Sequence, residues 1–216
     1  MKLYVYDHCP YCVRVRMIFG LKNVPVEQIV LANDDEETPI KLVGKKVVPI
    51  LLKDDGEAMP ESLDIVKYTD EHFGSKILDE SVRPELEVWM KRVGGYYNHL
   101  LLPRFVQLGL AEFATQSAID YFTKKKTEFI GDFAENLADS QQYIERLNQD
   151  LPELSQLLKA EDKANGVQVS LEDIMLFPML RNLTCVNGLV WLPNIQRYVE
   201  QMSALSRVPL YTNRAI

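Results

Sequence analysis

Long hydrophobic runs, an excess of positive charge and abundant cysteine are all missing from this sequence. No apolar stretch approaches the ~18 residues that a membrane-spanning helix requires. The 216 residues include 24 Lys and Arg against 31 Asp and Glu, which gives a formal net charge of −7. This charge argues against sequence-independent binding to nucleic acid or to anionic lipid. We therefore expect neither nucleic acid nor a membrane as a partner.

The first residues also lack the pattern of a secretory signal. Met1 and Lys2 lead directly into the short run Leu3–Tyr6, and Asp7 ends that run before the apolar core of a signal peptide could form. We therefore expect a cytoplasmic protein, in a compartment where thiols are normally reduced. Because only three cysteines are present, we do not expect a structural disulfide framework either.

The N-terminal residues alternate between strand and helix patterns. Short apolar runs predict strands at 3–6, 26–31 and 47–52, and the second run is apolar enough to be mostly buried. A helix with one apolar face is predicted from Pro10 to Leu21. A strand, a helix and a strand within about thirty residues form a βαβ unit, so the first two strands should be parallel.

Further signals complete this part of the chain. Asn23 should adopt the left-handed conformation after the first helix. Thr38 as a cap before Pro39 predicts a short helix that ends at Gly44. Asp55-Gly56 predicts a hairpin turn, and a last helix should cover residues 62–72. The resulting order β-α-β-α-β-β-α describes an α/β domain of the thioredoxin-like type.

From Pro84 onward no stretch predicts a strand. Prolines and Asn-Gly pairs separate six helical patterns, at 84–102, 116–126, 138–148, 152–159, 170–185 and 193–203. We therefore expect a thioredoxin-like domain at residues 1–73, a linker at 74–84 and an all-helical domain at 85–216.

Two of the three cysteines belong to the sequence Cys9-Pro10-Tyr11-Cys12, between the first strand and the first helix. Cys9 should lie at the helix N-terminus, where unpaired backbone N–H groups and the positive end of the helix dipole stabilise a thiolate. Its pKa should therefore fall below the ordinary value of ~8.5. Cys12 lies one turn deeper on the same face. This arrangement predicts Cys9 as the attacking nucleophile and Cys12 as the resolving thiol.

Half of a zinc site is the alternative interpretation of this pair. Zinc would need two further ligands, but Cys185 is isolated and the three histidines have no ligand spacing relative to one another. A CxxC motif that opens a helix after an N-terminal strand favours redox chemistry. We therefore expect no metal.

Pro49 interrupts the third apolar run at Val48-Pro49-Ile50. A trans proline there would remove a hydrogen bond from the sheet, so a cis Val48–Pro49 bond is the favoured explanation. That bond would place the backbone N–H and C=O of Val48 beside the Cys9 sulfur, able to pair with an extended peptide. The alternative is an edge-strand proline with no functional role.

Pro60-Glu61-Ser62 marks the start of the helix at 62–72. Ser62 by itself is best explained as an N-cap. With Glu61 beside it, the same helix end could instead hold a zwitterionic amino acid, whose carboxylate would lie on the helix N–H groups and whose ammonium would lie on Glu61. The γ-glutamyl end of glutathione is such a group.

Together, CPYC at 9–12, Val48-Pro49 and Glu61-Ser62 resemble the glutaredoxins. With its helical second half, the whole chain resembles the glutathione transferase superfamily and, within it, the long two-domain bacterial glutaredoxins. Ser170 and Asp173 match the buried Ser-x-x-Asp capping box of the central helix in that superfamily. The resemblance implies glutathione-dependent thiol–disulfide exchange, with glutathione as co-substrate.

The resemblance also implies partners and binding residues. Cys9 would attack disulfide-containing or glutathionylated proteins, and either Cys12 or glutathione would release the product. On the same resemblance, we expect this chain to be a monomer. The implied glutathione contacts are Cys9, Tyr11, Val48, Pro49, Glu61 and Ser62. A basic residue for the glycine carboxylate is not identified, since Lys45 and Lys46 are better explained as surface charges.

Two other functions stay open on the same fold. A cysteine-type glutathione transferase or dehydroascorbate reductase would need Cys9 but not Cys12. A non-enzymatic interaction protein would usually have lost the reactive cysteine. The intact pair of cysteines favours the glutaredoxin over both.

The remaining notable residues have simpler explanations. Cys185 lies among apolar residues and should be a buried, inert thiol. His8 is better explained as a solvated loop histidine than as a group that stabilises the thiolate. Lys124–Lys126 is too small a patch to indicate nucleic-acid binding. Trp89, Tyr96 and Tyr97 could face a cleft between the two domains, but packing in the core explains them equally well.

Overall fold

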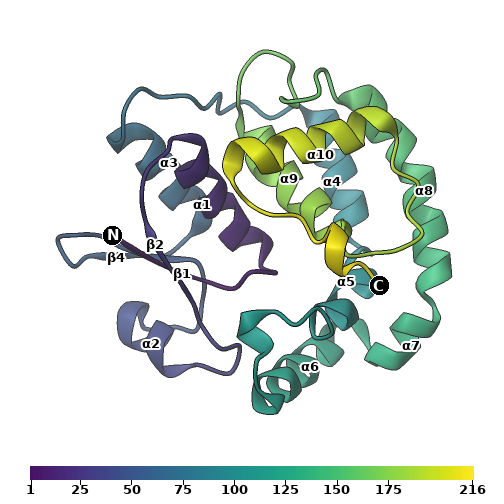
Figure 1. Cartoon of the computed structure of the whole chain (residues 1–216), viewed down its shortest axis with the longest axis horizontal. Coiled ribbons are helices and arrows are strands. Elements are labelled where there is room, and N and C mark those ends of the chain that lie inside the picture. Colours follow the sequence, from purple (N-terminus) through teal and green to yellow (C-terminus); the bar gives the residue numbers. More distant parts are fainter.

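The computed structural model describes all 216 residues, which form two parts packed side by side (Figure 1). The N-terminal part is built on a four-stranded sheet in the order β2-β1-β3-β4. Its strands are β1 (Lys2–Val5), β2 (Glu27–Val30), β3 (Ile50–Leu52) and β4 (Ala58–Met59). The predicted parallel pairing of the first two strands is confirmed, while β3 pairs with β1 and β4 antiparallel.

Three helices cover this sheet. α1 (Pro10–Leu21) and α3 (Ser62–His72) pack against each other on one side, and α2 (Glu37–Val43) lies on the other side (Figure 1). This order confirms the predicted thioredoxin-like arrangement. Gly44, with a φ of 75°, ends α2, and Asn23, with a φ of 54°, follows α1 in the left-handed region, as predicted.

Three local predictions in this part are wrong. β2 is an edge strand in which only Ile29 is partly covered, so it is not mostly buried. β3 begins after Pro49 rather than at Val47, because proline has no N–H for the ladder. Thr38 does not cap α2. Instead, its N–H donates to the Asp35 carboxylate at 2.9 Å, and the helix begins at Glu37, two residues earlier than predicted.

The second part is helical, as predicted. Its helices are α4 (Pro84–Gly94), α5 (Asn98–Phe105), α6 (Gln116–Ile130), α7 (Phe133–Ala138), α8 (Ser140–Leu157), α9 (Leu171–Leu183) and α10 (Pro193–Ser206), with short 3-10 turns η1 (Ala111–Phe113) and η2 (Thr212–Arg214). None of these helices is long and apolar enough to cross a membrane.

Helix boundaries in this part differ from the prediction at three places. The predicted helix at 84–102 is two helices, because α4 ends at Gly94-Gly95, a pair with low helix propensity. Pro152 does not separate two helices but lies within α8. Its position is exposed, while Leu151 beside it is buried in the core. The six-residue helix α7 is not predicted at all.

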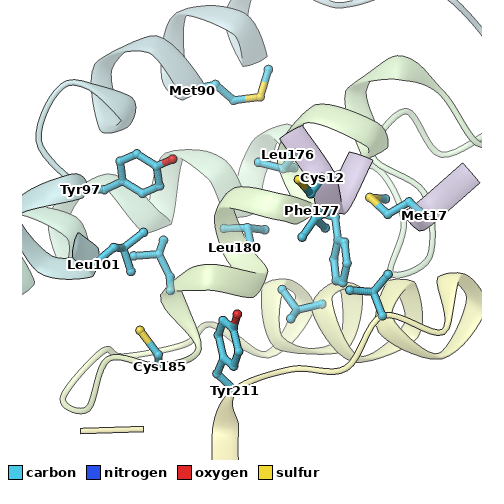
Figure 2. Packing of buried hydrophobic residues seen from close by; sticks show 14 of the residues in the cluster. Cys12, Met17, Met90, Tyr97, Leu101, Leu176, Phe177, Leu180, Cys185 and Tyr211 are labelled. Carbon is cyan, nitrogen blue, oxygen red and sulfur yellow. The ribbon is translucent and has the colours of Figure 1, made fainter. Parts of the chain in front are cut away.

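α1 joins the two parts. It is buried on more than the one predicted face, because α3 covers one side and α9 and α10 cover another. A Cβ atom at Gly20 would lie 1.8 Å from the Ser206 carbonyl oxygen, so only glycine allows α1 to approach α10 this closely. Figure 2 shows Cys12 beside Leu176 and Phe177 of α9, inside a continuous cluster of buried apolar residues that includes both parts.

The start of α9 is fixed by a buried capping box. The Ser170 N–H donates to the Asp173 carboxylate at 2.9 Å, and the Ser170 hydroxyl and the Asp173 backbone complete the reciprocal pair. The second carboxylate oxygen of Asp173 accepts from the Ala164 N–H and from the Tyr198 hydroxyl. The capping box therefore connects three segments of the helical part, namely the loop at Ala164, the start of α9 and α10.

Candidate active site

The strand-to-helix junction places the two nearby cysteines differently. Cys9 has extended backbone angles (φ −71°, ψ 118°) at the N-cap position of α1 and is half-buried. Cys12 lies one turn further along, is completely buried and accepts the Tyr6 N–H at 3.4 Å. Only Cys9 is therefore within reach of a substrate disulfide while the protein keeps this conformation.

The same junction shifts the pKa values of the two thiols in opposite directions. A hydrogen bond from the Cys12 thiol is the largest effect that lowers the pKa of Cys9, which falls to about 7 although burial opposes it. Attraction to His8 and the backbone N–H groups of Cys12 and Tyr11 add to the shift, which includes the predicted contribution of the helix N-terminus. Burial and the Cys9 charge raise the pKa of Cys12 well above its ordinary value.

Cys9 opens into a cavity of about 530 Å³ between the two parts of the molecule. Tyr11 and Val48 also line it, and the Val48–Pro49 peptide bond is cis. The backbone N–H and C=O of Val48 make no hydrogen bond within the chain, so both are free to pair with a ligand. The helical part supplies the opposite lining, from α5, α6 and the end of α9.

Glu61 and Ser62 are arranged differently from the sequence interpretation. Glu61, not Ser62, is the N-cap residue of α3, and it has a φ of 71°, which is rare for a residue with a side chain. Ser62 is the first helical residue, so its interpretation as a simple N-cap is wrong. The Glu61 carboxylate is exposed and paired with Lys45 at 3.0 Å. Neither Glu61 nor Ser62 lines the cavity that Cys9 opens into.

His8 is not the solvated loop residue that the sequence suggests. Its side chain is buried, and its ring Nδ1 lies 2.7 Å from the carboxylate of Glu112, which is completely buried in η1. The His8 backbone N–H donates to the same carboxylate oxygen at 3.0 Å. Its carbonyl accepts from the Asn182 side chain at 2.8 Å. Three contacts with residues of the helical part thus fix the position of His8, the residue before Cys9.

Asp7 forms a second buried link to the helical part. Its carboxylate accepts two hydrogen bonds from Arg181, a completely buried residue of α9, at 3.0 and 3.1 Å. Arg16 and the Tyr211 hydroxyl donate to the same carboxylate. Burial would raise the pKa of Asp7, but Arg181, Arg16 and Tyr211 outweigh it and lower the pKa to about 2.

Known proteins match both parts of this chain. The family model described as "Glutaredoxin 2, C terminal domain" matches residues 85–215, and the glutathione S-transferase N-terminal domain model matches residues 3–77. Glutaredoxin 2 of Escherichia coli K12 is 48% identical over the full length of both chains. The chain belongs to the glutaredoxin 2 family. It is therefore an enzyme of the glutathione-dependent thiol oxidoreductase class.

Solved structures agree with this membership. The crystal structure of Salmonella typhimurium glutaredoxin 2, which is in complex with glutathione, has a TM-score of 0.97 and 46% identity and covers all of this chain and 98% of its own. A glutathione transferase Omega 3C from Trametes versicolor has a TM-score of 0.56 at 19% identity, covering 97% of this chain and 84% of its own. That second likeness shows only that glutaredoxin 2 proteins share the glutathione transferase fold.

Several residues of the site were missed by the sequence interpretation. Lys46 is not a surface charge like Lys45, because its ammonium lines the Cys9 cavity and lies 3.5 Å from the centre of the Tyr121 ring. Tyr97 lines the cavity, whereas Trp89 and Tyr96 hydrogen-bond to Asp150 inside the helical part. No local pattern marks these residues, since their partners are distant in the sequence.

Cys185 is completely buried, as expected, and burial raises its pKa to about 12. It lies in the helical core well away from Cys12 in Figure 2. Cys9 is therefore the single thiol of the chain that combines exposure with a lowered pKa.

Proposed function

We propose that Cys9 is the nucleophile and Cys12 the resolving thiol of this oxidoreductase. The observation that carries the proposal is the half-buried Cys9 sulfur at the N-terminus of α1, whose pKa is lowered to about 7 by a buried thiol donor. Near neutral pH a large fraction of Cys9 is then thiolate, the form that attacks disulfides.

With a glutathionylated protein, one thiol of the enzyme is enough. The Cys9 thiolate attacks the glutathione sulfur, the protein–glutathione S–S bond breaks, and the protein leaves as a thiolate that takes up a proton. The Cys9–glutathione disulfide is then attacked by the thiolate of a second glutathione. Oxidised glutathione leaves, and the Cys9 thiolate is restored. Glutathione supplies both electrons.

With a protein disulfide, Cys12 completes the exchange. Cys9 forms a mixed disulfide with the protein, and Cys12 loses its proton and attacks the Cys9 sulfur. The protein leaves as a dithiol, and the enzyme keeps a Cys9–Cys12 disulfide that two glutathione molecules reduce. The raised pKa of Cys12 fits this order of events, because Cys12 stays a thiol and a hydrogen-bond donor until Cys9 has reacted.

We place glutathione along the wall that runs from Cys9 to Val48 and Pro49. The unpaired backbone N–H and C=O of Val48 would bind its peptide backbone, and exposed Tyr11 would cover it. The γ-glutamyl end would bind at the N-terminus of α3, with Ser62 and Glu61. Lys46 is our candidate for the glycine carboxylate, because it lines the cavity that Cys9 opens into and Lys45 does not. The Salmonella relative was solved in complex with glutathione, which supports the presence of a glutathione site in this chain.

The cellular context is a separate part of the proposal. We infer that the protein acts on disulfide-containing or glutathionylated proteins as a monomer in the cytoplasm, where glutathione is available as the reductant. We also propose domain boundaries at residues 1–73 and 85–216, joined by a linker at 74–84.

The deciding experiment measures turnover of a glutathione mixed disulfide, coupled to NADPH oxidation through glutathione reductase. Cys9→Ser should abolish turnover, whereas Cys12→Ser should keep it and lose the reduction of protein disulfides. Residual Cys9→Ser turnover above a few percent would overturn the assignment of the nucleophile. Conjugation of 1-chloro-2,4-dinitrobenzene without reductase activity would instead indicate a transferase.

A further inference from the structure

The cavity beside Cys9 differs in charge from the rest of the molecule. The chain has a net charge of −7, yet the cavity is lined by Lys46, Lys125 and Lys126 and by no Asp or Glu. Like charges that face one cavity repel one another. The arrangement is favourable once an anion enters the cavity.

The three lysines are not equally available to a ligand. Lys46 donates to the Asn33 carbonyl at 2.7 Å and lies 4.0 Å from the Glu36 carboxylate, so much of its charge is already balanced. Lys125 and Lys126 form no ion pair and no hydrogen bond in the structure. Both belong to α6, which is part of the helical half and supplies none of the glutathione contacts proposed above.

α6 presents these charges together with the exposed ring of Phe129 and the half-buried ring of Tyr121, whose hydroxyl donates to the Glu36 carboxylate. Tyr121, Lys125 and Phe129 recur every four residues and therefore lie on one face of the helix, with Lys126 beside them. Phe129 is 72% exposed although it is a large apolar residue. We call Tyr121, Lys125, Lys126 and Phe129 the α6 face. A ligand for it should carry both negative charge and apolar groups.

We propose that the α6 face binds the polypeptide around the substrate cysteine and selects acidic residues beside it. The proposal rests on the function proposed above, because the substrate disulfide must reach Cys9 in the same cavity. An acidic segment would place its carboxylates on Lys125 and Lys126 and an apolar side chain against Phe129. A substrate with basic residues next to its cysteine would meet repulsion instead.

The test compares two peptides that share one glutathionylated cysteine, one flanked by Asp and Glu and the other by Lys. Wild-type enzyme should show a higher kcat/KM for the acidic peptide. In the double variant Lys125→Gln/Lys126→Gln, the acidic-to-basic ratio of kcat/KM should fall about fivefold, because two partly exposed ion pairs are lost. Rising salt should reduce the wild-type ratio as well.

Lys124→Gln is the matched control. Lys124 belongs to the same run of lysines but does not line the cavity. Its substitution removes one positive charge, as each substitution in the double variant does, and leaves the α6 face unchanged. The ratio in Lys124→Gln should stay near the wild-type value. A ratio that falls as far in this control as in the double variant would show a general charge effect and overturn the proposal.

Two further outcomes separate this proposal from the proposed function. If wild-type enzyme turns over both peptides equally well, the α6 face does not select acidic segments, although the oxidoreductase assignment stands. If the double variant raises the KM for glutathione and weakens every substrate alike, Lys125 and Lys126 are glutathione ligands and the proposal fails. Wild-type enzyme that turns over neither peptide nor a small glutathione mixed disulfide would contradict the proposed function itself.

Discussion

Two groups of residues surround Cys9, and they differ in how fully they are hydrogen-bonded. Asp7 and His8, just before Cys9, are held by buried residues of the helical part, and most polar groups there have partners inside the protein. The Val48 backbone and the Lys125 and Lys126 side chains line the cavity from different parts of the molecule and make no hydrogen bond within the chain. The first group fixes where the thiol lies, and the second is available to pair with a ligand.

The comparison also explains why a second domain is attached to a thioredoxin-like fold. Arg181, Asn182 and Glu112 all belong to the helical part, yet they hydrogen-bond to the two residues that precede Cys9. Burying so many polar and charged groups is favourable only when each finds its partner. The helical part is therefore a structural component of the active-site loop and not merely a neighbour.

The largest effect should come from breaking the link between Arg181 and Asp7. Arg181→Met removes a buried charge that donates to Asp7 and leaves the carboxylate with fewer partners, which should lower the free energy of unfolding by about 3–5 kcal/mol. Urea denaturation measures this change. Arg197→Met, which removes an exposed pair with Glu161, is the control and should cost less than about 1 kcal/mol. A loss in Arg181→Met no larger than in this control would show that Arg181 does not hold the loop.

The link between Arg181 and Asp7 also predicts how the stability of the protein depends on pH. The pKa of Asp7 is lowered to about 2 in the folded protein, from an ordinary value of 3.8. The carboxylate thus adds about 2 kcal/mol of stability above its ordinary pKa, and this is lost as pH falls towards 2. Between about pH 5 and pH 2.5, the urea midpoint of Asp7→Asn should fall less steeply with decreasing pH than the midpoint of wild type. Exposed Asp120→Asn should keep the wild-type slope, and an unchanged slope in Asp7→Asn would refute the assignment.

A smaller effect should separate two variants of Cys12. Cys12→Ala removes the donor that contributes most to the lowered pKa of Cys9, so that pKa should rise and alkylation of Cys9 at pH 6 should slow by about tenfold. Cys12→Ser keeps an O–H donor and should slow alkylation much less. The pH profile of the iodoacetamide reaction measures both. Profiles that match wild type in both variants would mean that the helix N-terminus, not Cys12, sets the acidity of Cys9.

The smallest effect should come from Glu112. Burial would raise the pKa of its carboxyl, but the contacts with His8 keep that pKa below its ordinary value. Glu112→Gln keeps the shape of the side chain and removes the carboxylate charge that lies 2.7 Å from the His8 ring nitrogen. The pKa of Cys9 should then rise by less than in Cys12→Ala, because attraction to His8 is a weaker cause than the Cys12 hydrogen bond. A change in stability with no shift in the alkylation pH profile would restrict Glu112 to a structural role.

The sequence was sufficient for the parts of the site that depend on local order. The CPYC motif between a strand and a helix predicts the N-cap position of Cys9 and the burial of Cys12, because helical spacing alone determines both. The cis Val48–Pro49 bond followed from a proline inside an apolar run. The capping box at Ser170 and Asp173 was recognisable because its two members are three residues apart.

Predictions failed where a distant segment decides the outcome. His8 looks like a loop residue until Glu112 is placed beside it, and Lys46 looks like a surface charge until α6 closes the cavity. β2 was expected to be buried because its apolar content says nothing about its place at the sheet edge. Pro152 was expected to separate two helices, but it lies at an exposed position within the single helix α8.

The sequence by itself determined the order of elements in the N-terminal part and the class of reaction, and it predicts Cys9 as the reactive cysteine, because strand and helix patterns and the CxxC spacing are local. Only the tertiary structure decided what holds that cysteine and what faces it. Hydrogen bonds from Arg181 to Asp7 and from Asn182 to His8 span 174 positions. No local pattern encodes such contacts, since they exist only once the helical part has packed against α1.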